Sequence, residues 1–218
     1  PLLQSAYYQP FGPIAGWTWG NGTAYSRHFD TDGRLDAYPL ANNTRSLGYD
    51  AASRIQNKTD TNPSNTTTYT YDVLDRLQSW LPGSTNQSYY YDANGNRNTL
   101  VLGASSYTYT LSPTSNRLNN VAGPIPKTYT YNNAGSLTND GSTVFGYDGG
   151  NRMVSASRGT TTNYTLNALG QRIVKSTSSS STQFLYDEAG HLIGEYSPTG
   201  SPIAETVYLG DTPVAVMK

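Results

Sequence analysis

The chain has 218 residues, a formal net charge of −1 and no cysteine. Disulfide frameworks and thiolate metal sites are therefore excluded, and the lack of a basic run argues against binding nucleic acid or an anionic membrane through a charge patch. Apolar residues make up 35% and charged residues 13%, both low for a globular protein, whereas tyrosine occurs 19 times. Such a composition is typical of a β-protein with many turns.

Residues 1–27 contain the first strand and hairpin signals. Trp17 and Trp19 are two residues apart, so they would share one face of a strand. Asn21-Gly22 follows directly and is typical of a tight hairpin turn. We therefore expect residues 1–27 to form N-terminal strands that lead into the rest of the chain.

The two ends of the sequence indicate a piece of a longer protein. It starts with Pro1 and stops abruptly at Lys218 after an apolar run. No signal peptide is visible at the start, and no stretch has the length of a transmembrane helix. We therefore expect a segment without a membrane span or a visible leader of its own.

The heptad Tyr91-Asp92-Ala93-Asn94-Gly95-Asn96-Arg97 predicts the tip of a β-hairpin. Asp92 can accept hydrogen bonds from backbone N–H groups of the following turn. Gly95 stands where a type I turn with a bulge needs a positive φ. Arg97 would open the returning strand.

Degenerate copies of this motif recur about every 20 residues from residue 28 onward. The residue that follows the aromatic position, or its replacement, is found at Asp30, Asp50, Asp72, Asp92, Thr110, Asn132, Asp148, Asn167 and Asp187. The position with positive φ is assigned to Gly33, Gly95, Gly135, Gly170 and Gly190, with Asn151, Ser53 and Asp75 as substitutes. The arginine after it is assigned to Arg34, Arg54, Arg76, Arg97, Arg117, Arg152 and Arg172. The period fits one hairpin per repeat, and residues 28–218 are predicted to be one continuous domain.

The strands that enter the turns alternate aromatic and small polar residues, as in Tyr69-Thr70-Tyr71. This period of two predicts an all-β fold of repetitive antiparallel hairpins in a continuous curved sheet. One face would be a ladder of stacked aromatic rings and the other a surface of threonine and serine. Loops are expected at residues 57–67, 112–114, 176–182 and 197–200.

The repeated acidic and basic residues allow more than one interpretation. The aspartates could be paired catalytic carboxylates or Ca²⁺ ligands, but a catalytic carboxylate is needed once, and repetition favours a cap on each turn. The arginines would pair with these aspartates or with carbonyl oxygens, and a stripe that binds polyanions is the alternative. His28 and His191 are interpreted as structural, because two isolated histidines cannot form a zinc site. No catalytic, cofactor-binding or metal-binding residue is predicted.

The aromatic residues support a second functional hypothesis. Trp17, Trp19 and Trp80 could stack on sugar rings. The chain would then be a carbohydrate-binding β-repeat module that acts at cell surfaces. The simpler interpretation places these rings in the interior or in the wall of the sheet.

The motif Tyr-Asp-x-x-Gly-(Asn)-Arg-Leu, at a spacing near 20 residues, resembles the YD repeat of bacterial Rhs proteins, toxin-complex C components and teneurins. The flanking stretches Tyr8–Pro13 and Glu205–Val216 are similar to the bacterial Rhs branch. The resemblance implies a long antiparallel sheet that spirals into a hollow shell around a C-terminal toxin domain. The shell's partner would be that toxin domain, and export would use a type VI or related secretion machine.

The resemblance also marks what this sequence lacks. The family's residues for releasing its toxin lie in an Asp-Pro motif downstream of the repeats, and that motif is absent, so no cleavage residue is assigned. The function expected from the sequence is a non-enzymatic shell segment without a cofactor. Open sheet edges of such a segment would allow self-association.

Overall fold

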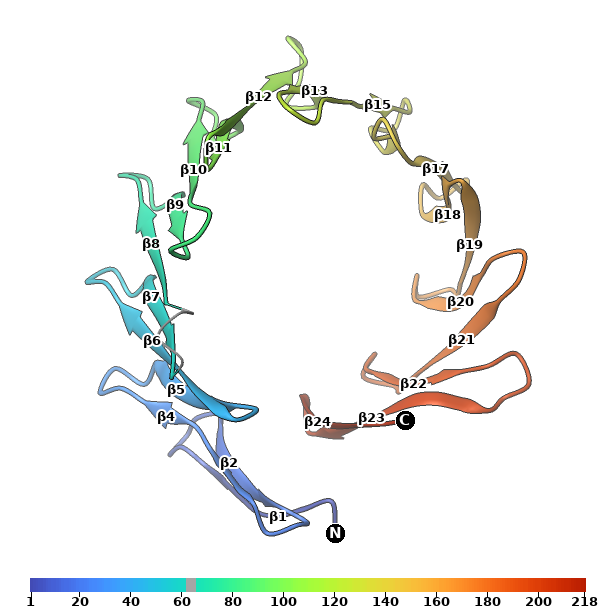
Figure 1. The fold of residues 1–218 in the computed structure, drawn as a ribbon. Helices are drawn as coiled ribbons and strands as arrows, with labels where there is room; N and C mark the ends of the chain where they lie inside the picture. The colour runs from blue at the N-terminus through green and yellow to red at the C-terminus, as the bar shows by residue number, and fades with distance from the viewer. Residues whose placement is uncertain (62–65) are drawn as a thin grey trace. The chain divides into compact units, whose positions relative to one another are not determined.

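The computed structural model describes residues 1–61 and 66–218, and its regular elements are all β-strands (Figure 1). The prediction of an all-β chain built from antiparallel hairpins is confirmed. The strands are divided among three sheets instead of forming a single one. Within each sheet the strand order follows the chain, so every strand pairs with its neighbours in sequence.

The first sheet is formed by the N-terminal residues. Its strands are β1 (Leu3–Tyr8), β2 (Ile14–Trp19) and β3 (Ala24–Ser26). Ile14, Ala15 and Trp17 of β2 are buried. The ring of Trp17 stacks on Tyr25 at 4.2 Å between centroids.

The second sheet has 11 strands. They are β4 (His28–Phe29), β5 (Leu35–Leu40), β6 (Asn43–Tyr49), β7 (Ile55–Asp60), β8 (Thr67–Tyr71), β9 (Leu77–Leu81), β10 (Gln87–Tyr91), β11 (Arg97–Leu102), β12 (Ser105–Leu111), β13 (Leu118–Ala122) and β14 (Lys127–Thr128).

The third sheet has 10 strands. They are β15 (Thr130–Tyr131), β16 (Leu137–Asn139), β17 (Val144–Tyr147), β18 (Met153–Arg158), β19 (Thr160–Leu166), β20 (Arg172–Ser176), β21 (Ser181–Tyr186), β22 (Leu192–Tyr196), β23 (Pro202–Leu209) and β24 (Thr212–Met217).

The sheets are separated by single residues within otherwise extended runs. β3 pairs with β2 and β4 pairs with β5, and between them the Arg27 amide still donates to the Ala15 carbonyl at 2.7 Å. β14 and β15 are separated in the same way by Tyr129, whose amide donates to the Asn119 carbonyl at 2.9 Å. The hydrogen-bonded ladder is interrupted at Arg27 and at Tyr129. The strand before each of these residues pairs with the strand that precedes it in the chain, and the strand after each pairs with the strand that follows it.

The chain also divides into two compact units. One comprises Pro1–Tyr109 with Ala122–Pro124, and the other comprises Thr110–Val121 with Ile125–Lys218. The single continuous domain over residues 28–218 stays a prediction.

Two of the expected loops are shorter than predicted. Of the loop assigned to residues 57–67, Asn57–Asp60 belong to β7 and Thr67 opens β8, while residues 62–65 lie outside the described part of the chain. In the serine-rich run 176–182, Ser176 ends β20 and Ser181 opens β21. Between them the Thr177 amide donates to the Ser180 carbonyl at 2.8 Å, which makes a tight turn. Cross-strand pairing continued further than composition suggested, because polar residues fit the exposed positions of a strand.

Buried apolar side chains are few in the described residues. Besides those of β2, they are Val121, Phe184 and Val214. Burial of apolar area contributes in proportion to the area removed from water, at about 25 cal/mol per Å². Because so few apolar residues are buried, other contacts must contribute much of the stability of these sheets. These contacts are found at the turns.

Candidate functional site: a repeated turn unit

One turn geometry recurs along both compact units. In the turn that starts at Asp72, the Asp72 amide donates to the Arg76 carbonyl at 2.9 Å, and the Asp75 amide donates to the Asp72 carbonyl at 3.1 Å. We call this five-residue arrangement the turn unit and its first residue the anchor. The same two bonds recur with the anchors Asp30, Asp50, Asp92, Asn132, Asp148, Asn167, Asp187 and Ser197.

The anchor side chain stabilises the turn through its oxygen atoms. Asp72 Oδ1 accepts hydrogen bonds from the amides of Leu74 at 2.9 Å and Arg76 at 3.0 Å. Asn167 Oδ1 accepts the equivalent bonds from Leu169 and Gln171 at 3.0 and 2.9 Å. The turn therefore needs an acceptor oxygen at the anchor, but it does not need a negative charge there.

The fourth residue of the unit has a positive φ. Gly95 has φ 84°, and the non-glycine residues Ser53, Asp75 and Asn151 have φ 61°, 62° and 60°. Residues with a Cβ adopt this left-handed region at a cost. The conformation is retained at these three positions because the anchor's hydrogen bonds enforce it.

The fifth residue is arginine in the units anchored at Asp30, Asp50, Asp72 and Asp148. The guanidinium Nε of each lies 2.7–3.0 Å from the anchor's Oδ2. The guanidinium bond of Arg54 is the main cause that holds the pKa of Asp50 below its usual value, followed by the Arg54 amide. Charge-assisted bonds of this kind are stronger than neutral ones.

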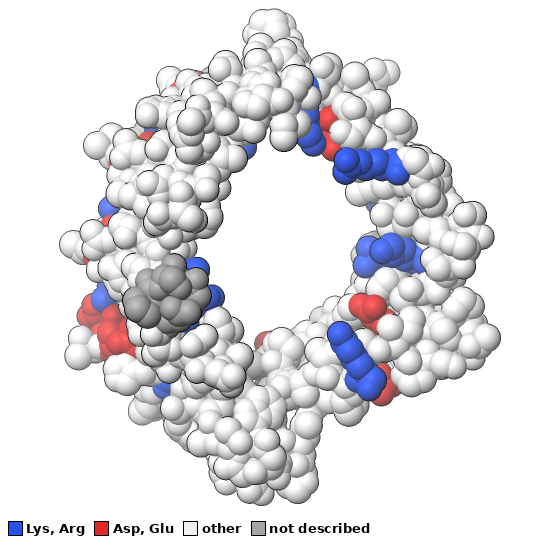
Figure 2. Space-filling view, in the orientation of Figure 1, with Lys and Arg blue, Asp and Glu red and all other residues white. Residues whose placement is uncertain are grey.

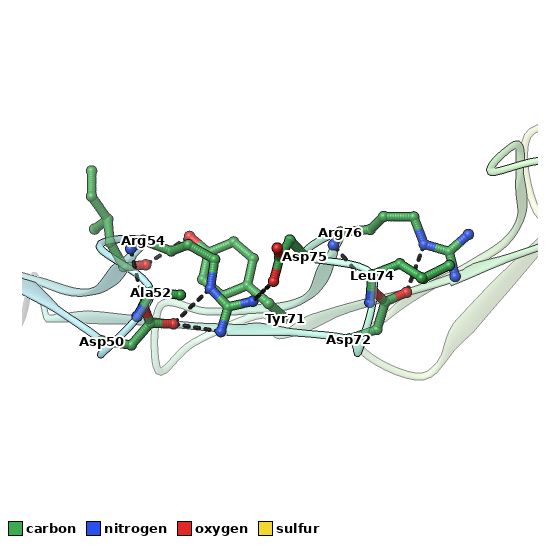
Figure 3. A network of polar contacts seen from close by, with 9 residues as sticks. Asp50, Ala52, Arg54, Tyr71, Asp72, Leu74, Asp75 and Arg76 are labelled. Carbon is green, nitrogen blue, oxygen red and sulfur yellow. Dashed lines mark hydrogen bonds and ion pairs between the residues drawn. The ribbon is translucent and has the colours of Figure 1, made fainter.

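In six of the nine units, a tyrosine directly before the anchor reaches back to the preceding repeat. Tyr71 Oη donates to the Ile55 carbonyl at 2.7 Å, and the ring of Tyr71 lies under the guanidinium of Arg54 at 4.6 Å (Figure 3). Arg54 also forms an ion pair with Asp75 of the next unit. Tyr71 and Arg54 together therefore join one turn unit to the next.

This joint recurs along the chain. Equivalent hydroxyl bonds to a carbonyl of the preceding repeat come from Tyr49, Tyr91, Tyr131, Tyr147, Tyr186 and Tyr208. Arg34 lies over Tyr49 at 4.7 Å and Arg76 over Tyr91 at 4.6 Å. Sequence reasoning did not assign this role to the tyrosine, although its fixed place before the anchor is the signal that pointed to it.

The predicted ladder of stacked aromatic rings is wrong for these tyrosines. The ring–ring contacts in the described residues are those of Trp17 with Trp19 and Tyr25 and of His191 with Tyr208. A strand and a turn separate successive pre-anchor tyrosines, and over four of these rings an arginine lies instead. The stacking is therefore between a cation and a ring.

Arg97 and Arg172 stand one position later than the arginines that bond to an anchor. The fifth residues of their units are Asn96 and Gln171, whose amides bond to the anchor. Arg97 opens β11 and lies 4.4 Å over the ring of Tyr109, while Arg172 opens β20 and lies 4.4 Å over Phe184. These two arginines contact the following strand instead of the acid in their own turn.

Two turns differ from the sequence assignment. Thr110 lies inside β12, and the turn that follows starts at Ser112, whose amide donates to the Arg117 carbonyl at 2.8 Å. This turn is one residue longer than the others. The stretch 197–200, expected to be a variable loop, is a complete turn unit in which Ser197 Oγ accepts from the Ser201 amide at 3.0 Å. A serine oxygen thus replaces the carboxylate.

The three tryptophans do not share a groove. Trp17 is buried at 4% exposure beside Trp19 in the first sheet, whereas Trp80 lies in β9 of the second sheet. Trp19 borders a hollow lined by Pro1, Leu2, Gly20 and Asn21, and Trp80 borders a different one with Arg45 and Asp60. The geometry therefore does not favour a common sugar-stacking surface.

Ion pairs with aspartate involve six of the 14 lysine and arginine side chains, all of which lie in the described residues. On the face seen in Figure 2 charged side chains are scattered over a largely uncharged surface. Within residues 1–61 and 66–218, no three His, Cys, Asp or Glu side chains gather into a possible metal site. In the same part of the chain, no helix has the length and apolar character needed to cross a membrane. His28 Nδ1 lies 2.5 Å from Asp36 Oδ1 at the protein surface.

Comparisons with known proteins agree with an all-β chain built from repeated hairpins. The family model described as teneurin YD-shell matches residues 41–208. No curated protein matches the chain by sequence. Among solved structures, the chain is similar to the one described as TcdB2-TccC3-Cdc42, with a TM-score of 0.52 and 14% identity over 97% of this chain and 16% of that one.

A second structure has a similar fold. The structure described as TcdB2-TccC3 without its hypervariable C-terminal region gives a TM-score of 0.50 and 14% identity, over 99% of this chain and 16% of that one. Our chain thus spans about one sixth of the length of the proteins that it matches. These two likenesses concern the fold.

Proposed function

This chain belongs to the teneurin YD-shell family, and we propose that it is a non-enzymatic wall segment of an Rhs-type polymorphic toxin. In this proposal the wall encloses or carries a toxin domain located C-terminal to it in the same polypeptide. The observation that carries the proposal is the series of turn units, six of which are joined to the preceding repeat by a tyrosine hydroxyl and four of these also by an arginine over the ring.

A wall needs sheets that keep their order without a thick apolar layer over them. The turn units supply such order from the ends of the strands, through bonds between side chains and backbone. The described residues bury few apolar side chains, so both faces of a sheet can remain available to border a space. This arrangement suits a container better than a compact enzyme with a pocket in its core.

The proposed partners follow from the same idea. The first is the toxin domain of the same polypeptide, and the second is the secretion machinery that would export it to the cell surface or to another bacterium. One of the structures with a similar fold is described as lacking a hypervariable C-terminal region. A variable region after the shell is what we propose for the protein that contains this chain.

Limited proteolysis of the complete polypeptide tests the proposal. We expect the C-terminal domain to resist protease while the shell is intact and to be cleaved faster in the double variant Arg54→Leu/Arg76→Leu, which removes two joints. Arg158→Leu is the matched control, because Arg158 is exposed at the end of β18 and belongs to no turn unit. A gene without a further domain, or a C-terminal domain cleaved as fast in the wild type as in isolation, would overturn the proposal.

A further inference from the structure

One turn unit has a histidine where four others have arginine. His191 is the fifth residue of the unit anchored at Asp187. Its amide donates to Asp187 Oδ1 at 2.8 Å, and its ring Nδ1 lies 2.8 Å from Asp187 Oδ2. These contacts match those that Arg54 makes with Asp50.

The opposite side of the imidazole contacts the last hairpin. Nε2 of His191 lies 3.2 Å from Oδ1 of Asp211, which is in the two-residue tip between β23 and β24. The ring stacks on Tyr208 of β23 at 4.7 Å between centroids. Tyr208 Oη donates to the Leu192 carbonyl at 3.2 Å. His191 therefore joins its turn to the next repeat as the arginines do.

We propose that His191 makes the attachment of the β23–β24 tip to the 187–191 turn depend on pH, so that mild acid tightens the attachment and alkali loosens it. The chemistry of the ring gives the reason. A protonated imidazole donates from both nitrogens and can bond to Asp187 and Asp211 together. A neutral imidazole has one N–H, so one of the two carboxylates then faces a lone pair. Arginine stays charged, and the units that contain it have no such dependence.

The surroundings of the ring determine the direction of the effect. The charged groups that act on it are Asp187 from its own turn and Asp211 from the hairpin tip, and Tyr208 supplies the stacking face. The hydrogen bond to Asp187 is the main cause that raises the pKa of His191, with burial opposing it. A raised pKa in the folded state means that the stabilisation is fully present below the unfolded value of about 6.5 and is lost as the pH rises through the folded value.

Asp187 sets the other limit of the pH range. Its pKa is lowered chiefly by the hydrogen bond from His191. The contribution of this carboxylate is present above its unfolded pKa of about 3.9 and is lost as the pH falls through the lower folded value. The attachment is therefore strongest between these two titrations.

Hydrogen exchange provides the test. We compare amide protection in peptides that cover residues 202–217 between about pH 5.5 and 8.5, each value divided by that of His191→Arg under the same conditions, which cancels the intrinsic pH dependence of exchange. An exposed pair of this kind predicts about a two- to fivefold loss of relative protection across this range. Asp211→Asn should reduce this change and leave the Asp187 contact in place.

Histidine NMR provides an independent measurement. The chain has two histidines, so the variant His28→Gln leaves a single imidazole resonance to follow. We expect its titration midpoint to lie above that of an unfolded histidine and to fall in Asp211→Asn. Identical pH profiles of protection in the wild type and in His191→Arg would overturn the proposal, as would a titration midpoint that Asp211→Asn leaves unchanged.

Discussion

At the residue scale, the turn unit separates the need for a particular backbone conformation from the need for a charge. Asp72 and Asn167 accept the same amide bonds although one carries a charge and the other does not. Gly95 and Asp75 have the same sign of φ although one lacks a Cβ. The unit therefore tolerates degeneracy at each position while its hydrogen bonds persist.

Replacing Gly95 by alanine tests the conformational requirement. A Cβ at Gly95 would meet no atom within 4 Å, so any loss reflects φ 84° rather than a clash. We expect destabilisation of about 1 kcal/mol in chemical denaturation. Gly149→Ala is the control, because its φ lies outside the left-handed region and its surroundings are equally open. Equal losses in the two variants would contradict this account.

Replacing Tyr71 by phenylalanine tests the joint between repeats. The variant keeps the ring under Arg54 but loses the hydroxyl bond to the Ile55 carbonyl. We expect a loss of about 1 kcal/mol, the usual net contribution of such a bond. Tyr90→Phe, at a tyrosine that is 53% exposed, should leave the unfolding free energy nearly unchanged. A Tyr71→Phe variant as stable as Tyr90→Phe would show that the hydroxyl bond contributes little.

The sequence allowed some of these roles to be predicted and concealed others. The roles of Asp92 and Gly95 could be assigned because both residues act within a single turn of five residues. The Tyr91 hydroxyl could not, since its acceptor, the Leu77 carbonyl, is 14 residues away and depends on strand register. Serine at position 197 was also missed, because an Asp-based motif does not include an Oγ acceptor.

At the scale of the element, six of the hairpins contain an anchor acid whose pKa is lowered by the hydrogen bonds of its own turn. This holds for the anchors Asp30, Asp50, Asp72, Asp92, Asp148 and Asp187. A lowered folded pKa contributes stability above the unfolded value of about 3.9 and loses it as the pH falls through the folded value. We therefore expect the hairpins to lose stability together in acid.

The double variant Asp50→Asn/Asp72→Asn tests this expectation, since asparagine anchors occur naturally in the chain. It should unfold with a Tm lower by about 2–4 °C at neutral pH, and its stability should fall less steeply below about pH 4. Circular dichroism as a function of temperature and pH gives both quantities. Glu188→Gln, at an exposed acid, serves as the control. A double variant with the wild-type acid profile would contradict the role of these carboxylates.

Strand pairing was predictable only in outline. The alternation in Tyr69-Thr70-Tyr71 correctly indicated a strand, and β8 covers it. The boundaries at Arg27 and Tyr129 were not visible, because the local sequence stays extended through both and only the pairing partner changes. Which strand a given strand pairs with depends on the rest of the chain and not on its local sequence.

At the scale of the whole molecule, the strands at the ends of each sheet order have one partner within the described residues. β24 is such a strand, with Val216 and Met217 at 58% and 49% exposure. Unpaired strand edges pair readily with other chains. We expect the isolated chain to self-associate through such edges.

Light scattering on the isolated chain tests this prediction. Val216→Lys should lower the weight-average mass at a given concentration, because a charge on an edge strand opposes pairing. Val144→Lys is a suitable control, since Val144 is similarly exposed at 55% but lies in β17, between two partner strands. A wild-type chain that stays monomeric at all concentrations would refute the expectation.

The tyrosine hydroxyl bonds each reach back to the preceding repeat, to an acceptor 10 to 16 residues earlier in the chain. Each joint is complete within two neighbouring repeats. A gene can therefore gain or lose one repeat of about 20 residues without compensating substitutions elsewhere. Length variation by whole repeats should be the least disruptive route by which such a protein evolves.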